Sequence, residues 1–225
     1  MTQVHRFRES SSPYIDRVWR SHNVTDGTYR ATPDGSWDII VLIQQDGSRS
    51  VMLAGQATEP MDVPYTAGTS SVVISFAAGA YLPSYSGKKM LNLAEMLPNS
   101  GPDHFVLAGK TFATPTFDTA EKLVASMLAE GLLKMDDVVA SILNGNTKAL
   151  SDRAKQRHFL DVTGLTRKSL EQIQRAQEAV RQLQSGKKPI EVAADAGFTD
   201  QAHLAKSLKK IMRSKPSDVN NIHKI

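Results

Sequence analysis

The sequence predicts an α+β protein in which a β-rich N-terminal domain precedes an all-helical C-terminal domain. Short apolar runs separated by turn residues extend from residue 29 to about residue 112, as in a β-rich domain. After residue 115, apolar residues instead recur at three- and four-residue steps, which is the spacing of amphipathic helices. A length of 225 residues suits two domains, and we place them at 1–133 and 134–225.

The N-terminal domain contains three clear strand patterns, at residues 37–43, 51–55 and 71–76. Turn-forming triplets lie around them, namely Pro-Asp-Gly at 33–35, Gln-Asp-Gly at 45–47 and Ala-Gly-Thr at 67–69. The close spacing of strands and turns predicts a small antiparallel barrel or sandwich.

A helix is predicted at residues 118–131. Asp118 and Glu121 have the spacing of a capping box, and five apolar residues follow at helical steps between Leu123 and Leu132. Gly131 suits a helix end.

The net charge of +4 is distributed unevenly along the chain. Residues 1–133 carry 10 Lys or Arg against 13 Asp or Glu, whereas residues 134–225 carry 17 against 10, so the helical domain has a net charge of +7. A basic domain attracts polyanions, and nucleic acid is the commonest of these.

Residues 190–211 have the pattern of a helix-turn-helix. Pro189 suits the first turn of a short helix over residues 189–196, Gly197 permits a sharp turn, and Phe198 is placed to fill the angle between two helices. We expect Thr199 to cap the next helix with its hydroxyl. Leu204, Leu208 and Ile211 would face the core, which leaves a polar and basic outer face of the kind that enters the major groove.

A similar arrangement lies upstream. Ser151 is placed to cap a helix that Gly164 ends, Phe159 would pack it, and residues 136–143 would form the preceding helix across a long turn at 144–150. Between the two motifs, an amphipathic helix is predicted from the recurrence of six residues, namely Leu170, Ile173, Ala176, Gln177, Val180 and Leu183.

The run from Val192 to Leu204, in which Gly-Phe-Thr-Asp-Gln-Ala-His-Leu follows a short Ala-rich helix, resembles the second helix-turn-helix of AraC-type transcription regulators. Ser151, Arg153, Gln156, Arg157, Phe159, Gly164 and Leu165 resemble the first recognition helix of that family. Two positions depart from the family pattern. Leu208 stands where Phe is usual, and Arg213 stands where a Gly usually follows the recognition helix.

The resemblance implies a bacterial, cytoplasmic regulator that binds double-stranded DNA, with RNA polymerase and a second copy of the chain as further partners. The predicted DNA-binding residues are Arg153, Gln156, Arg157, Lys187, Thr199, Gln201, His203, Lys206, Lys209 and Lys210. The N-terminal part more loosely resembles cupin-like sensor domains, through residues 33–35, 53–60 and 76–80. Two interpretations of the barrel stay open, a small-molecule effector site and a filled interior that serves dimerisation.

The sequence argues against other classes. It has no Cys, and His5, His22 and His104 are scattered, so we predict no metal, no cofactor and no enzyme activity. No run approaches the length of a membrane span, and residues 1–12 lack the apolar stretch of a signal peptide. The alternatives to a regulator are a protein-binding anti-regulator that uses the helical domain and, less favoured, a cupin-type small-molecule enzyme.

Overall fold

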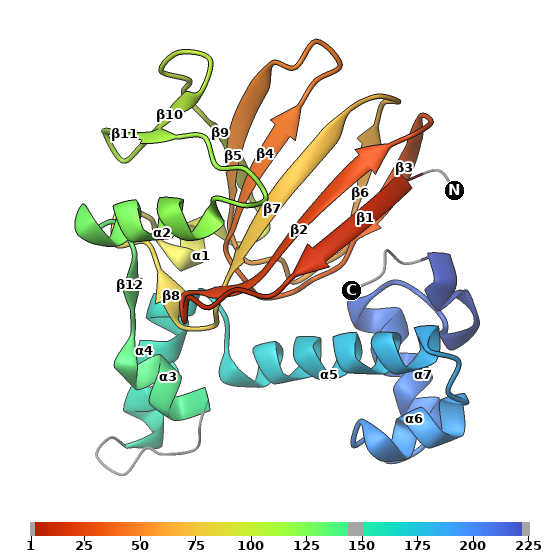
Figure 1. Ribbon diagram of the computed structural model, residues 1–225. Coiled ribbons are helices and arrows are strands. Elements are labelled where there is room, and N and C mark those ends of the chain that lie inside the picture. The colour runs from red at the N-terminus through yellow and green to blue at the C-terminus, as the bar shows by residue number, and fades with distance from the viewer. Residues whose placement is uncertain (1–2, 144–150, 222–225) are drawn as a thin grey trace. The chain divides into compact units, whose positions relative to one another are not determined.

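The computed structural model describes residues 3–143 and 151–221, and it shows a β-rich part followed by helices (Figure 1). This confirms the predicted fold class. The strands are β1 Gln3–Arg8, β2 Ile15–Asn23, β3 Gly27–Ala31, β4 Asp38–Ile43, β5 Arg49–Ala54, β6 Met61–Tyr65, β7 Ser70–Phe76, β8 Ala80–Tyr81, β9 Ala94–Leu97, β10 His104–Leu107, β11 Lys110–Ala113 and β12 Lys134–Met135. The helices are α1 Gly87–Met90, α2 Ala120–Ala129, α3 Asp137–Leu143, α4 Asp152–Thr163, α5 Arg167–Gln184, α6 Pro189–Asp195, α7 Gln201–Ile211 and the 3₁₀ helix η1 Pro216–Asn221.

The main sheet has six strands in the order β1-β2-β7-β4-β5-β9, and every neighbouring pair is antiparallel. The predicted strands at 37–43, 51–55 and 71–76 correspond to β4, β5 and β7. Strands β1 and β9 are the two edges, so among the described residues the predicted barrel is open.

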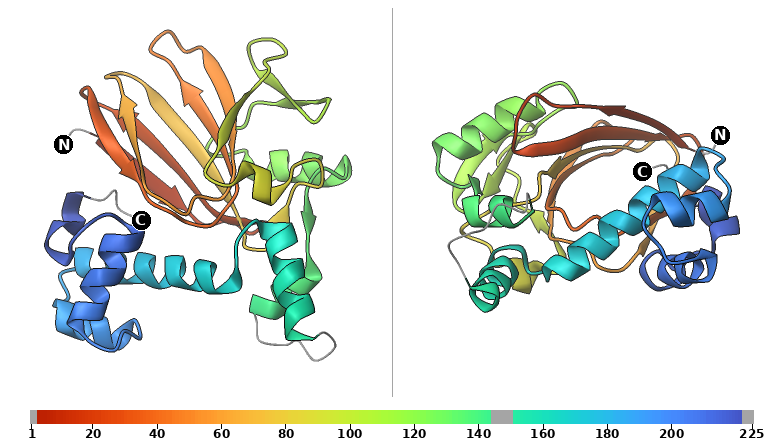
Figure 2. Two further views of the ribbon diagram at one scale, coloured as in Figure 1. Left: turned by 180° about the vertical axis from the view of Figure 1, so that it is seen from behind. Right: turned by 90° about the horizontal axis from the view of Figure 1, so that it is seen from below.

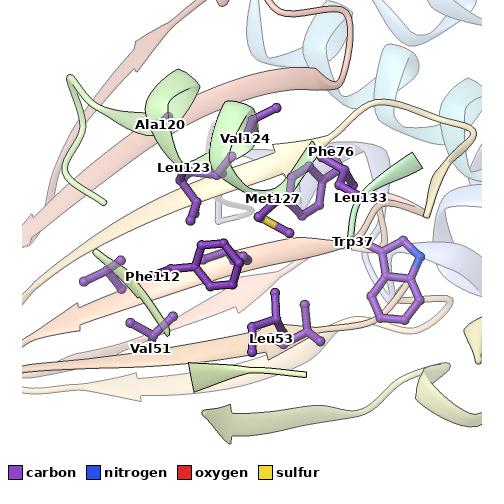
Figure 3. Close-up of a cluster of buried hydrophobic side chains, with 14 of the residues drawn as sticks. Trp37, Val51, Leu53, Phe76, Phe112, Ala120, Leu123, Val124, Met127 and Leu133 are labelled. Atoms are coloured by element: carbon purple, nitrogen blue, oxygen red, sulfur yellow. The ribbon is translucent and has the colours of Figure 1, made fainter. Parts of the chain in front are cut away.

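One face of this sheet carries the core of the β-rich part. The strand register places Val18, Ile74, Ile39 and Leu53 side by side on that face, and all four are buried. Helix α2 packs there through Leu123, Val124 and Met127, and the β10–β11 hairpin contributes Phe105 and Phe112 (Figure 3). Successive strand residues point to opposite faces, and in β4 the buried Ile39 and Val41 share the core face. Because β4 is apolar at every position from 39 to 43, burial in the structure, and not alternation in the sequence, identifies this face.

The helix predicted at 118–131 corresponds to α2, and Gly131 ends it with a left-handed backbone (φ 69°). The predicted capping box is wrong. The N-cap residue is Thr119, without a side-chain cap hydrogen bond, and the Glu121 carboxylate instead binds Arg8 and Ser10. The competing partners are more than 100 residues away in sequence, so local spacing could not reveal them.

Arg8 and Glu121 form a two-point ion pair, with Nη1 to Oε1 at 2.6 Å and Nη2 to Oε2 at 2.8 Å, and Ser10 Oγ donates to Oε1 at 2.7 Å. Hydrogen bonding from Arg8 lowers the pKa of Glu121 from 4.5 to about 2. A depressed pKa in the folded state stabilises the fold above the unfolded pKa, and this stabilisation is lost as the pH falls from about 4.5 towards 2.

We therefore expect Glu121→Gln to lower the free energy of unfolding at pH 7 by about 1–2 kcal/mol, a value discounted for partial solvent exposure. Urea unfolding should show that the difference in the free energy of unfolding between the variant and the wild-type chain narrows as the pH falls below 4.5, because the wild-type carboxylate is then protonated. Glu130→Gln, which removes a more exposed pair with Lys110, is the control. A difference in the free energy of unfolding that stays constant down to pH 2.5 would contradict the stabilising role of the Glu121 carboxylate.

Contacts divide the described chain into two compact units. Unit 2 comprises residues 28–35, 57–64 and those from 167 onward, and unit 1 comprises the rest. The first predicted helix-turn-helix, α3 and α4, is therefore grouped with most of the β-rich part. Two segments of the β-rich part are grouped with α5, α6 and α7, and hydrogen bonds join them to Gln177 of α5 and to Arg213 after α7. The sequence boundary at residue 133 remains a prediction.

In unit 1, the C-terminal end of α4 lies against α1 (Figure 2, left). Two glycines make the closest approach. A Cβ atom on Gly87 would lie 2.8 Å from the carbonyl carbon of Thr163, and a Cβ atom on Gly164 would lie 2.5 Å from that of Gly87. Since both obstacles are backbone atoms, neither position has room for a side chain.

Candidate nucleic-acid interface

The second helix-turn-helix forms as the sequence predicts. Helix α5 is followed by Gly186 at φ 91°, α6 begins with Pro189, and Gly197 turns the chain at φ 71° before α7. Phe198 is 7% exposed and packs into a cluster formed by α5, α6, α7 and Val219 of η1. All six predicted core residues of α5 are buried, so α5 is the support against which α6 and α7 pack (Figure 2, left).

The cap of α7 differs from the prediction. Asp200, not Thr199, is the N-cap residue, and its Oδ1 accepts a hydrogen bond of 2.7 Å from the backbone N–H of His203. A carboxylate at this place accepts more strongly than a hydroxyl and also complements the helix dipole. The Thr199 hydroxyl lies 3.1 Å from Nδ1 of His203 instead.

His203 is held on two sides. Besides the contact with Thr199, its ring packs edge-on against Phe198, with the ring centroids 5.4 Å apart. Both Thr199 and His203 belong to the predicted DNA-binding set and both are exposed, but they contact each other. This arrangement suits a role in positioning the start of α7.

Helix α7 has one buried side and one basic side. Leu204, Leu208 and Ile211 are buried, as predicted, whereas Gln201 and the three lysines Lys206, Lys209 and Lys210 are exposed. At about 100° per residue, the lysines lie on the half of the helix opposite Leu204. Within the described residues none of these three lysines forms an ion pair, so the basic side is available to an external anion.

Among the described residues, Lys187 is the one lysine of the predicted DNA-binding set with an acidic partner, because its Nζ lies 2.9 Å from Oδ2 of Asp195. The Asp195 carboxylate raises the pKa of Lys187 above its usual value. Its charge is thus partly neutralised within the protein, which separates it from the three lysines of α7.

The first helix-turn-helix is built on α3 and α4. Ser151 caps α4 by accepting from the N–H of Ala154, and Gly164 ends the helix at φ 74°, both as predicted. Phe159 is fully buried. Asp136 ties the two helices together, because its carboxylate accepts from the N–H of Val139 in α3 and lies 2.9 Å from Nε2 of His158 in α4. The long turn predicted at 144–150 lies outside the described residues.

Arg153, Gln156 and Arg157 of α4 are all exposed, and Asp152 and Asp161 are exposed on the same helix. The outward side of α4 is therefore of mixed charge, whereas that of α7 is uniformly basic. The structure places three of the predicted residues on α4 and five on α7, whereas Thr199 lies just before α7 and Lys187 just before α6.

Arg213 is a candidate site residue that the sequence analysis did not include. It stands after the end of α7, where the family pattern has Gly, and it adopts the left-handed backbone conformation (φ 49°) that favours Gly. An L-residue costs about 1–2 kcal/mol in that conformation. The signal in the sequence was its departure from the Gly of the family pattern.

No described helix is long and apolar enough to cross a membrane. Within residues 3–143 and 151–221, no three His, Asp or Glu side chains are grouped so as to hold a metal ion. The absence of a cofactor remains a prediction.

Two family models match the chain. Residues 147–221 match one described as "Helix-turn-helix domain", and residues 9–95 match one described as "Domain of unknown function (DUF6597)". No curated protein matches the chain. Among solved structures, ToxT from Vibrio cholerae matches at 11% identity over 99% of both chains, with a TM-score of 0.45. ToxT from Vibrio cholerae O395 matches at 10% identity over 100% of this chain and 99% of that one, with a TM-score of 0.42. A structure of ToxT from Vibrio cholerae strain SCE256, with an unsaturated fatty acid bound, matches at 11% identity over 99% of this chain and 96% of that one, with a TM-score of 0.43.

Fold and site together define a protein with a β-rich N-terminal domain and a helix-turn-helix C-terminal domain. The helix-turn-helix segment at 147–221 is of the AraC type, as the motifs around Gly197 and Gly164 predicted.

Proposed function

We propose that the chain is a transcription regulator that binds duplex DNA sequence-specifically, with α7 and α4 as its two recognition helices. The observation that carries the proposal is the basic side of α7, where Lys206, Lys209 and Lys210 lie opposite the buried Leu204 and Leu208. A capped helix after a glycine turn, with a basic outer side, fits the major groove.

The residues divide into two roles. Lysine contacts phosphate as a point charge or donates to the edge of guanine, whereas Gln and Arg recognise base edges through two-point hydrogen bonds. We assign phosphate contacts to Lys209 and Lys210, and base contacts to Gln201 and Lys206 of α7 and to Arg153, Gln156 and Arg157 of α4. Thr199 and His203 position the start of α7 in this scheme.

The test compares the full chain with two single variants on duplexes obtained by selection from random sequence. Lys209→Ala should weaken binding equally on selected and random duplexes and reduce the log–log salt slope by about 0.9. Gln201→Ala should lower discrimination by about 1–3 kcal/mol at particular base pairs. Fluorescence anisotropy at several salt concentrations measures both. If the two variants behaved alike, the assigned roles would be wrong, and a wild-type chain that bound no duplex at low salt would exclude the proposed function.

For the N-terminal domain, we favour the filled interior over an effector site. Trp37, Phe76, Phe112 and Met127 already pack on the core face of the sheet, together with helix α2 (Figure 3). The domain would then serve dimerisation and support of the first helix-turn-helix, and sedimentation of the full chain over a range of concentrations tests the dimer.

A further inference from the structure

Arg213 holds a carboxylate at the end of the recognition helix α7. Its Nη2 atom lies 2.7 Å from Oε2 of Glu59, which belongs to the segment 57–64 of unit 2. Glu59 comes from the β-rich part of the sequence, 154 residues before Arg213. Arg213 therefore combines a left-handed backbone with an ion pair that glycine could not make.

A second carboxylate is oriented beside the first. Arg30 binds Asp62 through Nε to Oδ1 at 2.8 Å and Nη2 to Oδ2 at 3.2 Å, and its Nη1 lies 3.5 Å from the carbonyl oxygen of Arg213. Hydrogen bonding from Arg30, with a smaller contribution from the charge of Arg213, lowers the pKa of Asp62. The segment 57–64 thus presents the carboxyl groups of Glu59 and Asp62 to the C-terminal end of α7.

A carboxylate and a DNA phosphate offer the same kind of acceptor to a guanidinium group. The Arg213 and Glu59 side chains are 62% and 65% exposed, so their ion pair is weak and a phosphate oxygen has access to replace the carboxylate. Lys209 and Lys210, which the proposed function assigns to phosphate, precede Arg213 by one helical turn or less. Arg213 and the two lysines thus lie at the same end of α7.

We propose that Arg213 is a phosphate-contacting residue of the second helix-turn-helix, and that Glu59 forms an ion pair with its guanidinium group in the absence of DNA. The inference depends on the proposed function, and it adds that Glu59 competes with DNA phosphate for the Arg213 guanidinium group. Segment 57–64 acts as an acidic substitute for the DNA backbone, and binding exchanges Glu59 for a phosphate. Displacing this segment is then a route by which the β-rich part influences DNA affinity.

The exchange predicts that removal of the competitor strengthens binding. Glu59→Gln in the full chain should bind a random-sequence duplex about two- to fivefold more tightly, which is the range of an exposed ion pair. Its log–log salt slope should steepen by up to about 0.9, because Arg213 then neutralises a phosphate without first leaving a carboxylate. Arg213→Gln should bind more weakly than the wild-type chain, and the double variant should lose the gain of Glu59→Gln.

Glu130→Gln is the matched control, since Glu130 also forms an exposed ion pair, with Lys110 in unit 1, and its loss changes the net charge equally. Thermal unfolding confirms that each variant is folded. Unchanged or weaker binding by Glu59→Gln overturns the inference, and so does an equal gain in Glu130→Gln or a gain that persists in the double variant. In these three cases the wild-type chain still binds DNA, so the proposed function stands. A wild-type chain that binds no duplex removes both.

Discussion

Gly164→Ala should destabilise the protein by about 3 kcal/mol or more, because the new Cβ atom meets two separate obstacles. The backbone at Gly164 is left-handed (φ 74°), which an L-residue adopts at a cost of about 1–2 kcal/mol. In addition, the Cβ atom would lie 2.5 Å from the carbonyl carbon and 2.6 Å from the carbonyl oxygen of Gly87. Backbone atoms cannot rotate away, so α4 would have to move from α1.

Two further glycine variants separate these contributions. Gly131 also follows a helix with a positive φ of 69°, but nothing lies within 4 Å of its Cβ position, so Gly131→Ala should cost only about 1 kcal/mol. At Gly87 the structure records no positive φ, so Gly87→Ala introduces the steric conflict without that backbone strain and should cost about 1–3 kcal/mol. Urea unfolding of the three variants measures each value. Equal costs for Gly164→Ala and Gly131→Ala would show that the contact with α1 is absent in solution.

The role of Gly164 also shows how far local sequence patterns extend. The pattern at 151–165 predicted a helix capped by Ser151 and ended by a left-handed Gly164, and both features are present. These interactions join residues within four positions of each other, so sequence spacing determines them. The contact of Gly164 with Gly87 joins residues 77 positions apart, and no local rule identifies such a partner.

The same distinction explains the errors and the omissions. The capping box at Asp118 and Glu121 failed because Arg8 and Ser10 attract the carboxylate from another element, and only the folded chain brings them together. Arg213 was seen as a departure from the family pattern, but its partner Glu59 could not be predicted. Thr199 was a different kind of error. Asp200, one residue later, is the stronger local acceptor, so the rule itself allowed the better choice.

Burial was predicted well wherever a helix has a clear apolar side. In α5 all six predicted core residues are buried, and in α7 burial of Leu204, Leu208 and Ile211 leaves the lysines outside. Lys187 was assigned by charge alone, and its pairing with Asp195 depends on the fold of α6 against α5. Amphipathic periodicity therefore predicts which side of a helix is free, whereas the partners of exposed charges require the structure.

The uniformly basic side of α7 should dominate DNA affinity. Replacing Lys206, Lys209 and Lys210 together by Gln should weaken duplex binding by about 10²–10³-fold, since each charge-assisted hydrogen bond to a phosphate or base edge contributes about 1.5 kcal/mol or somewhat less. The log–log salt slope should fall by about 1.8, which corresponds to the two phosphates assigned to Lys209 and Lys210. Anisotropy titrations of the full chain at several salt concentrations measure both quantities.

The control removes the same charge from unit 1. Lys89, Lys110 and Lys122 are exposed there, and their joint replacement by Gln lowers the net charge by three without changing α7. If affinity depended on the net charge of the protein alone, the two triple variants would weaken binding equally and the assignment to α7 would be wrong. A large loss confined to the α7 variant, with its melting temperature retained, separates local phosphate contacts from long-range attraction. Because α4 has acidic residues among its exposed arginines, the corresponding loss from Arg153 and Arg157 should be smaller per charge than that from α7.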